Sequence, residues 1–180
     1  MKTSRRATFL VLCALACSLA AADSATKNAR LTPKEEQAIR TAVENIRAAI
    51  VTENVEALMR NVSQKERLSC TDTPYTYSQA RKFLKDHDSV FYKSLFDSRK
   101  FAKDCGAWYP SEYPAISEKE FYSTASHEIS IESFDRNWVK VTIQSPVKAH
   151  YERWMYLHRE GAVWRVTGGS FVIGNCTCGG

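Results

Sequence analysis

Residues 153–166 read RWMYLHREGAVWRV, with apolar and polar side chains alternating on either side of Glu160-Gly161. A period of two that is interrupted by a tight turn is typical of a β-hairpin. Residues 126–133 and 138–144 alternate in the same way and are separated by the turn Phe134-Asp135-Arg136-Asn137. The last third of the chain is therefore predicted to form four consecutive antiparallel strands, the third over 151–159 and the fourth over 162–167.

The chain ahead of these strands has helical periodicity. Thr32-Pro33-Lys34-Glu35 is typical of a helix start, in which Thr32 caps the helix and Glu35 completes a capping box. An apolar stripe at helical spacing follows, at Ile39, Val43, Ile46 and Ile50. A short second helix is expected around 55–59.

A further helical stretch is expected from Ser78 to about Lys103, with a break near 86–88. Helices that precede an antiparallel meander predict an α+β fold, in which the N-terminal helices pack on one face of the sheet. The size fits a single domain, since the chain has 180 residues, 44% of them hydrophobic and 11% aromatic.

The first 22 residues are predicted to be a signal peptide. A basic start is followed by the apolar run 7–16 and by Ala20-Ala21-Ala22, so cleavage is expected after Ala22. The mature protein is then secreted or periplasmic and has no membrane span. The alternatives are a lipid anchor on Cys17 and an uncleaved leader.

Removal of the leader lowers the formal net charge from +5 to +2. A charge this small, without a basic run interleaved with aromatic residues, excludes nucleic acid as the expected partner. Residues 23–30 are predicted to be a flexible tail, residues 31–175 a single domain, and residues 176–180 a cysteine-containing tail.

Four cysteines remain in the mature chain, and they are Cys70, Cys105, Cys176 and Cys178. An even number in an oxidising compartment predicts two disulfides. Cys70–Cys105 is the preferred pair, because both cysteines lie in loop-like sequence that flanks one helical stretch. This disulfide would remove about 4 kcal/mol of unfolded-chain entropy. Cys176 and Cys178 could pair with each other, cross-link to the other two, bind a metal or exchange thiols.

Two stretches resemble the NTF2-like superfamily: AAIVTENVEAL at 48–58, and the hairpin at 153–166. The resemblance covers about Leu31 to Ile173 and is carried by the order and spacing of elements. It implies the cone-shaped α+β fold of ketosteroid isomerases and SnoaL-type cyclases, with a pocket between the helices and a curved sheet. It also implies that the outer sheet face frequently serves for dimerisation, and it implies no single function.

The enzymes of this superfamily place an acid, often with a tyrosine, inside the cone. No spacing in this chain identifies that acid, although Asp135 and Glu152 are available carboxylates. The candidate pocket residues are Tyr92, Phe96, Trp108 and Tyr151. A catalytic function is excluded if the cone is filled by Phe91, Leu95 and Phe96. A catalytic function is favoured if a buried acid of raised pKa faces a tyrosine.

The third strand carries Trp154, Tyr156 and His158 on one face, and Trp138 and Arg165 of the neighbouring strands are expected to join them. Met155, Leu157, Trp164 and Val166 would then face the helices. Large aromatic side chains with arginine on an outer sheet face are typical of association surfaces. We therefore predict a surface for a protein partner or a homodimer; the alternative is that these residues pack under a terminal segment such as 176–178.

Catalytic and metal motifs are incomplete. His127-Glu128 begins a zinc-protease pattern, but Ile131 stands where the second histidine is needed. The four histidines have no metal-ligand spacing, and no cofactor is expected. The predicted function is an exported, non-catalytic NTF2-like domain of immunity or envelope accessory type that binds a protein partner or a small apolar ligand. The alternative is a cofactor-free isomerase, dehydratase or hydrolase that uses a carboxylate in the cone.

Overall fold

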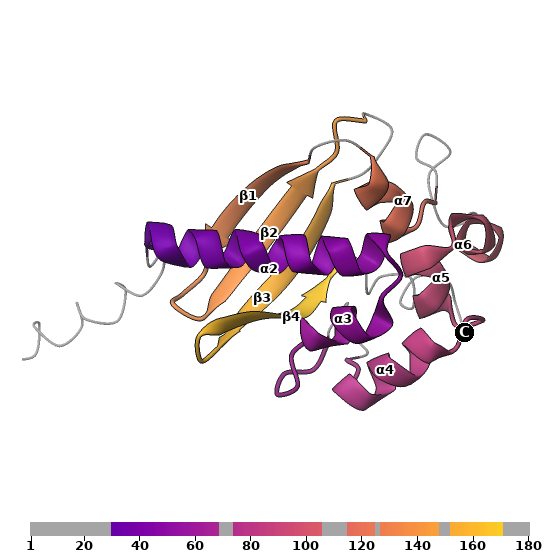
Figure 1. Ribbon diagram of the computed structural model, residues 1–180, viewed down its shortest axis with the longest axis horizontal. Helices are drawn as coiled ribbons and strands as arrows, with labels where there is room; N and C mark the ends of the chain where they lie inside the picture. Colours follow the sequence, from indigo (N-terminus) through magenta and orange to yellow (C-terminus); the bar gives the residue numbers. More distant parts are fainter. Residues whose placement is uncertain (1–29, 69–73, 106–114, 125–126, 148–151, 171–180) are drawn as a thin grey trace, which may run out of the picture.

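The computed structural model describes residues 30–68, 74–105, 115–124, 127–147 and 152–170. Six helices and four strands lie in these ranges: α2 (Pro33–Val51), α3 (Val55–Arg60), α4 (Tyr77–Lys85), α5 (Val90–Phe96), α6 (Ser98–Cys105), α7 (Glu118–Ser123), β1 (Glu128–Ser133), β2 (Trp138–Gln144), β3 (Arg153–Glu160) and β4 (Val163–Gly169). Helix α2 crosses one face of the sheet, and α4 to α7 gather beyond one end of it (Figure 1).

Helix α2 begins with the predicted capping box. The Glu35 N–H donates to the Thr32 hydroxyl at 3.3 Å, and a Glu35 carboxylate oxygen accepts from the Thr32 N–H at 2.9 Å. The predicted stripe at Ile39, Val43, Ile46 and Ile50 is buried. The helix ends at a turn in which Glu53 has a φ of 51°, and Asn54 then caps α3. Both predicted helices are therefore confirmed.

The predicted helix from Ser78 to Lys103 is three helices. The break near 86–88 is confirmed, since α4 ends before Asp86 and Ser89 caps α5. A second break at Asp97 was not predicted. The Asp97 carboxylate accepts the Lys100 N–H at 2.9 Å, which caps the start of α6 and separates it from α5.

Helix α7 was also missed from the sequence. Ser117 caps it by accepting the Glu120 N–H, and its Phe121 and Tyr122 side chains are 0% and 2% exposed. The Tyr122 carbonyl accepts from Arg47 of α2 at 3.3 Å. The helix is only six residues long, so tertiary burial rather than helix propensity holds it in place.

The four strands form one antiparallel sheet in the order β1-β2-β3-β4, as the alternating pattern predicted. Strand β4 extends to Gly169, two residues beyond the predicted end. Gly169 has a φ of 154°, and a Cβ there would lie 2.6 Å from the Trp154 carbonyl oxygen. Only glycine fits this close approach of β4 to β3.

The core lies between the helices and one face of the sheet. Met155, Leu157, Trp164 and Val166 are all at most 4% exposed, as expected for side chains that face the helices. Helices packed on one face of an antiparallel sheet confirm the α+β fold class. Among the described residues, no helix has the length and apolar character that crossing a membrane requires.

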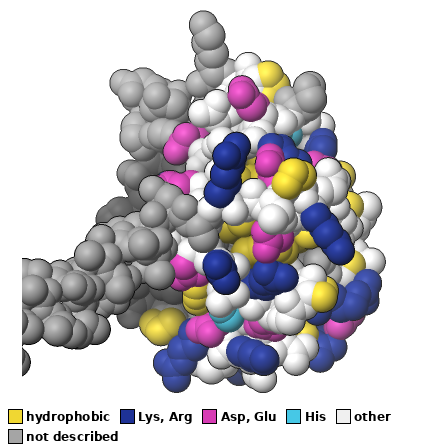
Figure 2. Space-filling view, turned by 90° about the vertical axis from the view of Figure 1, so that its left-hand side faces the viewer, with side chains coloured by type: hydrophobic (Ala, Val, Ile, Leu, Met, Phe, Trp, Pro, Cys, Tyr) yellow, Lys and Arg dark blue, Asp and Glu magenta, His cyan; other side chains and the backbone are white. Residues whose placement is uncertain are grey.

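The division into leader, tail, domain and C-terminal tail stays a prediction, because residues 1–29 and 171–180 lie outside the described ranges. Figure 2 views the molecule from the left-hand side of Figure 1, where α2 begins. Basic and acidic side chains are interspersed on this face. Near the start of α2, Glu35 forms an ion pair with Arg159 of β3 at 2.9 Å.

Candidate functional site

The sheet face turned away from the helices carries an aromatic row, formed by Trp138, Trp154, Tyr156 and His158. Trp138 stands opposite His158 in the strand register, and their ring centroids are 4.4 Å apart. The Trp154 and Tyr156 rings are 5.2 Å apart. All four side chains are half-buried, whereas Leu157 between Tyr156 and His158 is 0% exposed. The register therefore brings the predicted aromatic residues together on one face.

Three further side chains border the aromatic row. Arg165 of β4 is opposite His158 in the register, and Phe134 of the β1–β2 turn lies 6.0 Å from the Tyr156 ring and is 42% exposed. Glu66 lies 4.0 Å from the His158 Nδ1. Arg165 was predicted from the sequence; Phe134 and Glu66 were not, because both approach the row from turns outside the strand periodicity.

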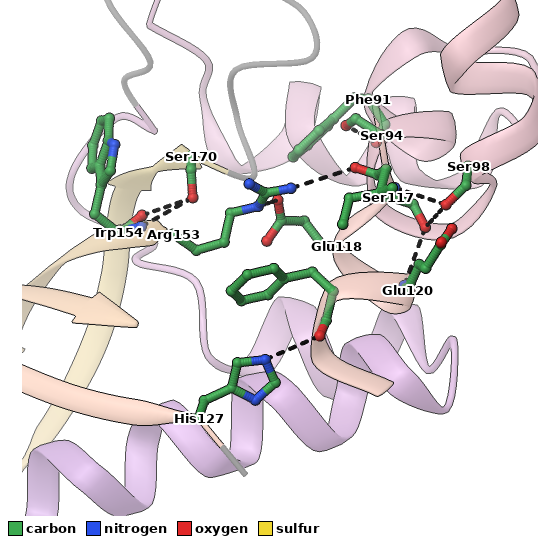
Figure 3. A network of polar contacts seen from close by, with 12 residues as sticks. Phe91, Ser94, Ser98, Ser117, Glu118, Glu120, His127, Arg153, Trp154 and Ser170 are labelled. Carbon is green, nitrogen blue, oxygen red and sulfur yellow. Dashed lines mark hydrogen bonds and ion pairs between the residues drawn. The ribbon is translucent and has the colours of Figure 1, made fainter. Parts of the chain in front are cut away.

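On the core side of the sheet, Arg153 and Glu118 form a buried ion pair (Figure 3). The Arg153 Nε donates to the Glu118 Oε1 at 2.7 Å, and the two residues are 8% and 4% exposed. The Arg153 guanidinium also lies 4.7 Å from the centroid of the Phe121 ring. These contacts join the start of β3 to α7.

Burial raises the pKa of the Glu118 carboxyl, and the charge of Arg153 opposes that shift. Burial also raises the pKa of Tyr122 well above its usual value, and the Glu118 charge adds to the effect. Glu118 is thus a buried acid of raised pKa whose charge acts on a tyrosine, which is the arrangement expected to favour a catalytic function. Sequence reasoning missed it, because its partner Arg153 lies 35 positions away.

Glu118 lines none of the three described cavities. Phe91, Leu95 and Phe96 are 1%, 0% and 7% exposed and belong to the main core. Helix α5, which carries them, packs against α4, α6 and α7 beyond one end of the sheet (Figure 1). The Glu118 carboxylate is enclosed by protein atoms and is not open to any of these cavities.

Two of the predicted pocket residues, Tyr92 and Phe96, line none of the described cavities. Tyr92 packs against Phe96 at 4.9 Å and stacks on His87 at 4.2 Å, and burial, followed by the nearby Glu53 charge, raises its pKa. Trp108 and Tyr151 lie outside the described residues.

Neither predicted carboxylate lies inside the cone. Asp135 accepts the Asn137 and Trp138 N–H groups at 2.7 and 3.0 Å and thereby shapes the β1–β2 turn. Glu152 is exposed. Both carboxylates are therefore poorly placed to act on a ligand held between the helices and the sheet.

Cys105 is 0% exposed at the end of α6 and is disulfide-bonded. The other three predicted disulfide cysteines, Cys70, Cys176 and Cys178, lie outside the described residues, so the pairing stays a prediction. Within the described ranges, no group of three or more His, Cys, Asp or Glu side chains is placed to hold a metal ion.

No protein-family model matches this sequence, and no curated protein matches it. Among solved structures, the chain is similar to a cystatin-like fold protein of unknown function from Nostoc punctiforme, with 9% identity, a TM-score of 0.44, and coverage of 78% of this chain and 92% of that one. A cystatin-like fold protein from Burkholderia xenovorans has 10% identity, a TM-score of 0.44 and coverage of 77% and 90%.

An NTF-2-like protein of unknown function from Shewanella oneidensis has 14% identity, a TM-score of 0.41 and coverage of 74% and 95%. The fold class itself rests on the strand order and helix packing described above.

Proposed function

We propose that this chain is an exported, non-catalytic binding domain that holds a protein partner, or a second copy of itself, against the aromatic row. The observation that carries the proposal is the register of β2 and β3. It gathers two tryptophans, a tyrosine and a histidine on the face opposite the core. Large aromatic side chains supply most of the binding energy at protein interfaces.

The position of the aromatic row favours a protein partner over a small apolar ligand. Phe91, Leu95 and Phe96 belong to the buried core, whereas the aromatic row remains partly exposed. A ligand pocket needs a concave space of about 300 Å³ or more with apolar walls. The aromatic row lies on the outer face of a sheet, which suits the surface of a protein better than an enclosed small molecule.

Export is the second part of the proposal and rests on the N-terminal sequence. A basic start, an apolar run and three alanines at 20–22 support cleavage after Ala22. The intact mass of the protein from its own compartment tests this part. A mass that begins at Asp23 supports cleavage, whereas a lipid on Cys17 would assign the protein to an anchored class.

A catalytic function is the second candidate, and the Glu118–Tyr122 pair is the observation that favours it. The pKa values of both groups are raised by burial, which is characteristic of acid–base sites. Arg153 already occupies one Glu118 oxygen. Saturable binding of an apolar probe that is abolished by Glu118→Gln, and by no change on the aromatic row, would favour this second candidate.

The experiment that tests the binding proposal is site-specific photo-crosslinking. A benzophenone amino acid replaces Tyr156 in the full chain, which is expressed in its own cells and irradiated. We expect one dominant adduct, to a second copy or to one other protein, identified by mass spectrometry. The matched control carries the benzophenone at Gln37, an exposed position on α2.

An adduct that forms equally well from position 37 reports random collision and would count against the aromatic row. Absence of any adduct from position 156, with the protein folded, would overturn the proposal. A copy-to-copy adduct would assign the row to a homodimer, and an adduct to a different protein would identify the partner.

A further inference from the structure

A groove runs between α2 and the outer edge of β4. It consists of two adjoining cavities of about 390 and 400 Å³, and Asn45, Asn61 and Arg165 line both. Alanines from α2 and α3, such as Ala42 and Ala57, line its apolar part. The groove lies outside the buried core, and the volume of each cavity is within the range of known ligand sites.

One wall of this groove is a sheet edge that is only partly paired. Residues 61–63 run parallel to the C-terminal half of β4: the Val166 N–H donates to the Asn61 carbonyl at 2.8 Å, and the Ser63 N–H donates to the Val166 carbonyl at 2.9 Å. The preceding half of β4 extends beyond this short segment. Figure 1 shows β4 at the edge of the sheet, with α3 nearby.

Trp164 contributes the unpaired backbone groups of that edge. Along a strand, the backbone N–H and C=O groups of successive residues point alternately to its two sides. The N–H and C=O of Trp164 therefore point to the same side as those of Val166, two residues later. Among the described residues, no backbone or side-chain group bonds to Trp164 on this side. Trp164, which is 4% exposed, is also one of the residues that line the groove.

The charge of the groove has one sign. Arg60 and Arg165 line it, and no aspartate or glutamate does. Within the part of the chain that is described, neither arginine is in an ion pair, whereas Arg81 on neighbouring α4 pairs with Glu56 at 2.8 Å. A negatively charged occupant would neutralise both arginines.

We infer that this groove binds an extended acidic segment of a protein partner, which adds as a strand to the open half of β4. The segment's backbone bonds to the Trp164 N–H and C=O. Its alternate side chains then point to the alanine floor and to the two arginines. This groove adjoins the aromatic row at Arg165. Its occupant, an acidic strand paired to the edge of β4, goes beyond the proposed function.

Fluorescence anisotropy with three labelled ten-residue peptides tests the inference. The first alternates valine with aspartate, the second alternates valine with lysine, and the third is the aspartate peptide N-methylated at every second amide, which blocks strand pairing. We expect saturable binding of the first peptide. Binding of the other two is expected to be at least about tenfold weaker, because each loses charge complementarity or backbone hydrogen bonds.

Two variants with matched controls locate the site. Asn45→Trp fills the groove from an exposed position and is expected to weaken binding about tenfold or more, whereas Gln37→Trp on the same helix is expected to leave it unchanged. Arg60→Gln is expected to weaken binding about threefold, whereas Arg67→Gln removes an equal charge outside the groove and is expected to have no effect. Thermal melts establish that each variant is folded.

Equal binding of the N-methylated peptide would overturn strand addition, and unchanged binding by Asn45→Trp would overturn the groove as the site. Absence of saturable binding, or equal affinity for a single-stranded oligonucleotide, would overturn the acidic-segment proposal. Trp154→Ala is expected to leave peptide binding unchanged. The experiments can therefore reject the aromatic row as an interface without rejecting the groove as a peptide site, and the reverse.

Discussion

The Nε of Arg153 lies 2.7 Å from the Oε1 of Glu118, and both side chains are almost entirely buried. This pair joins strand β3 to helix α7 across the end of the core. The other Glu118 oxygen is buried and has no hydrogen-bond partner among the described residues. The ion pair therefore compensates only part of the cost of burying the carboxylate.

We predict that Arg153→Met destabilises the protein by about 3 kcal/mol at neutral pH. The variant leaves the Glu118 carboxylate buried without its cation, and the packing over Phe121 loses its charged component. Urea unfolding followed by tryptophan fluorescence measures the change. A variant that is as stable as the wild type would show that the pair does not hold α7.

Glu118→Gln is predicted to gain stability relative to the wild type as the pH rises. The folded-state pKa of Glu118 is raised above its ordinary value of 4.5 by burial, so the folded protein binds this proton more tightly than the unfolded chain does. The stabilisation is fully present below pH 4.5 and is lost as the pH rises through the folded-state pKa. Glutamine carries no charge at any pH and avoids this loss.

The measurement is the free energy of unfolding of both proteins at several pH values from 4 to about 8. The difference, wild type minus variant, is expected to fall as the pH rises. Three other carboxyls have lowered pKa values, and they are Glu35, Glu56 and Asp104. Both proteins contain these carboxyls, so their effects on the free energy of unfolding cancel in the difference. A difference that stays constant or rises with pH would contradict a raised pKa of Glu118 in the folded protein.

Gly169→Ala is predicted to destabilise the protein by about 2 kcal/mol or more. Its backbone has a φ of 154°, and the added Cβ would meet the Trp154 carbonyl oxygen at 2.6 Å. Strands β3 and β4 would have to move apart to relieve the contact. Gly161→Ala is the control, because Gly161 has open space around its Cβ position; its φ of 67° predicts only the smaller cost of about 1 kcal/mol.

Trp154→Ala is predicted to weaken self-association or partner binding more than it weakens folding. The Trp154 side chain lies on the outer face and packs against Tyr156, so its removal leaves the buried core intact. Sedimentation velocity over a concentration series measures the assembly state, and urea unfolding measures the stability. An unchanged assembly state together with unchanged partner affinity would contradict the prediction.

The sheet was predictable because its strands follow one another in sequence. Alternation at 153–166 placed Met155 and Leu157 toward the core and Trp154 and Tyr156 away from it, and pairing with the neighbouring strands required only short turns. The start of α2 was equally local, since Thr32 and Glu35 form its capping box without help from the rest of the chain.

The features that the sequence analysis missed depend on distant contacts. Helix α7 is too short to give a periodic signal, and its Phe121 is buried by elements far away in sequence. The second break in the helical stretch depends on one side chain, Asp97, which caps the helix that follows it. Glu118 becomes a buried acid only when β3 brings Arg153 beside it, so no spacing along the chain could identify it.

The bridge between Val62 and Val166 has a consequence for the order in which the chain folds. The segment after α3 leaves the ribosome early, but its strand partner is among the last residues of β4. The early helices must therefore wait for almost the whole chain before this contact closes, which makes folding slow and non-local. A chain truncated before β4 would leave β3 as an unprotected edge and would be prone to aggregate.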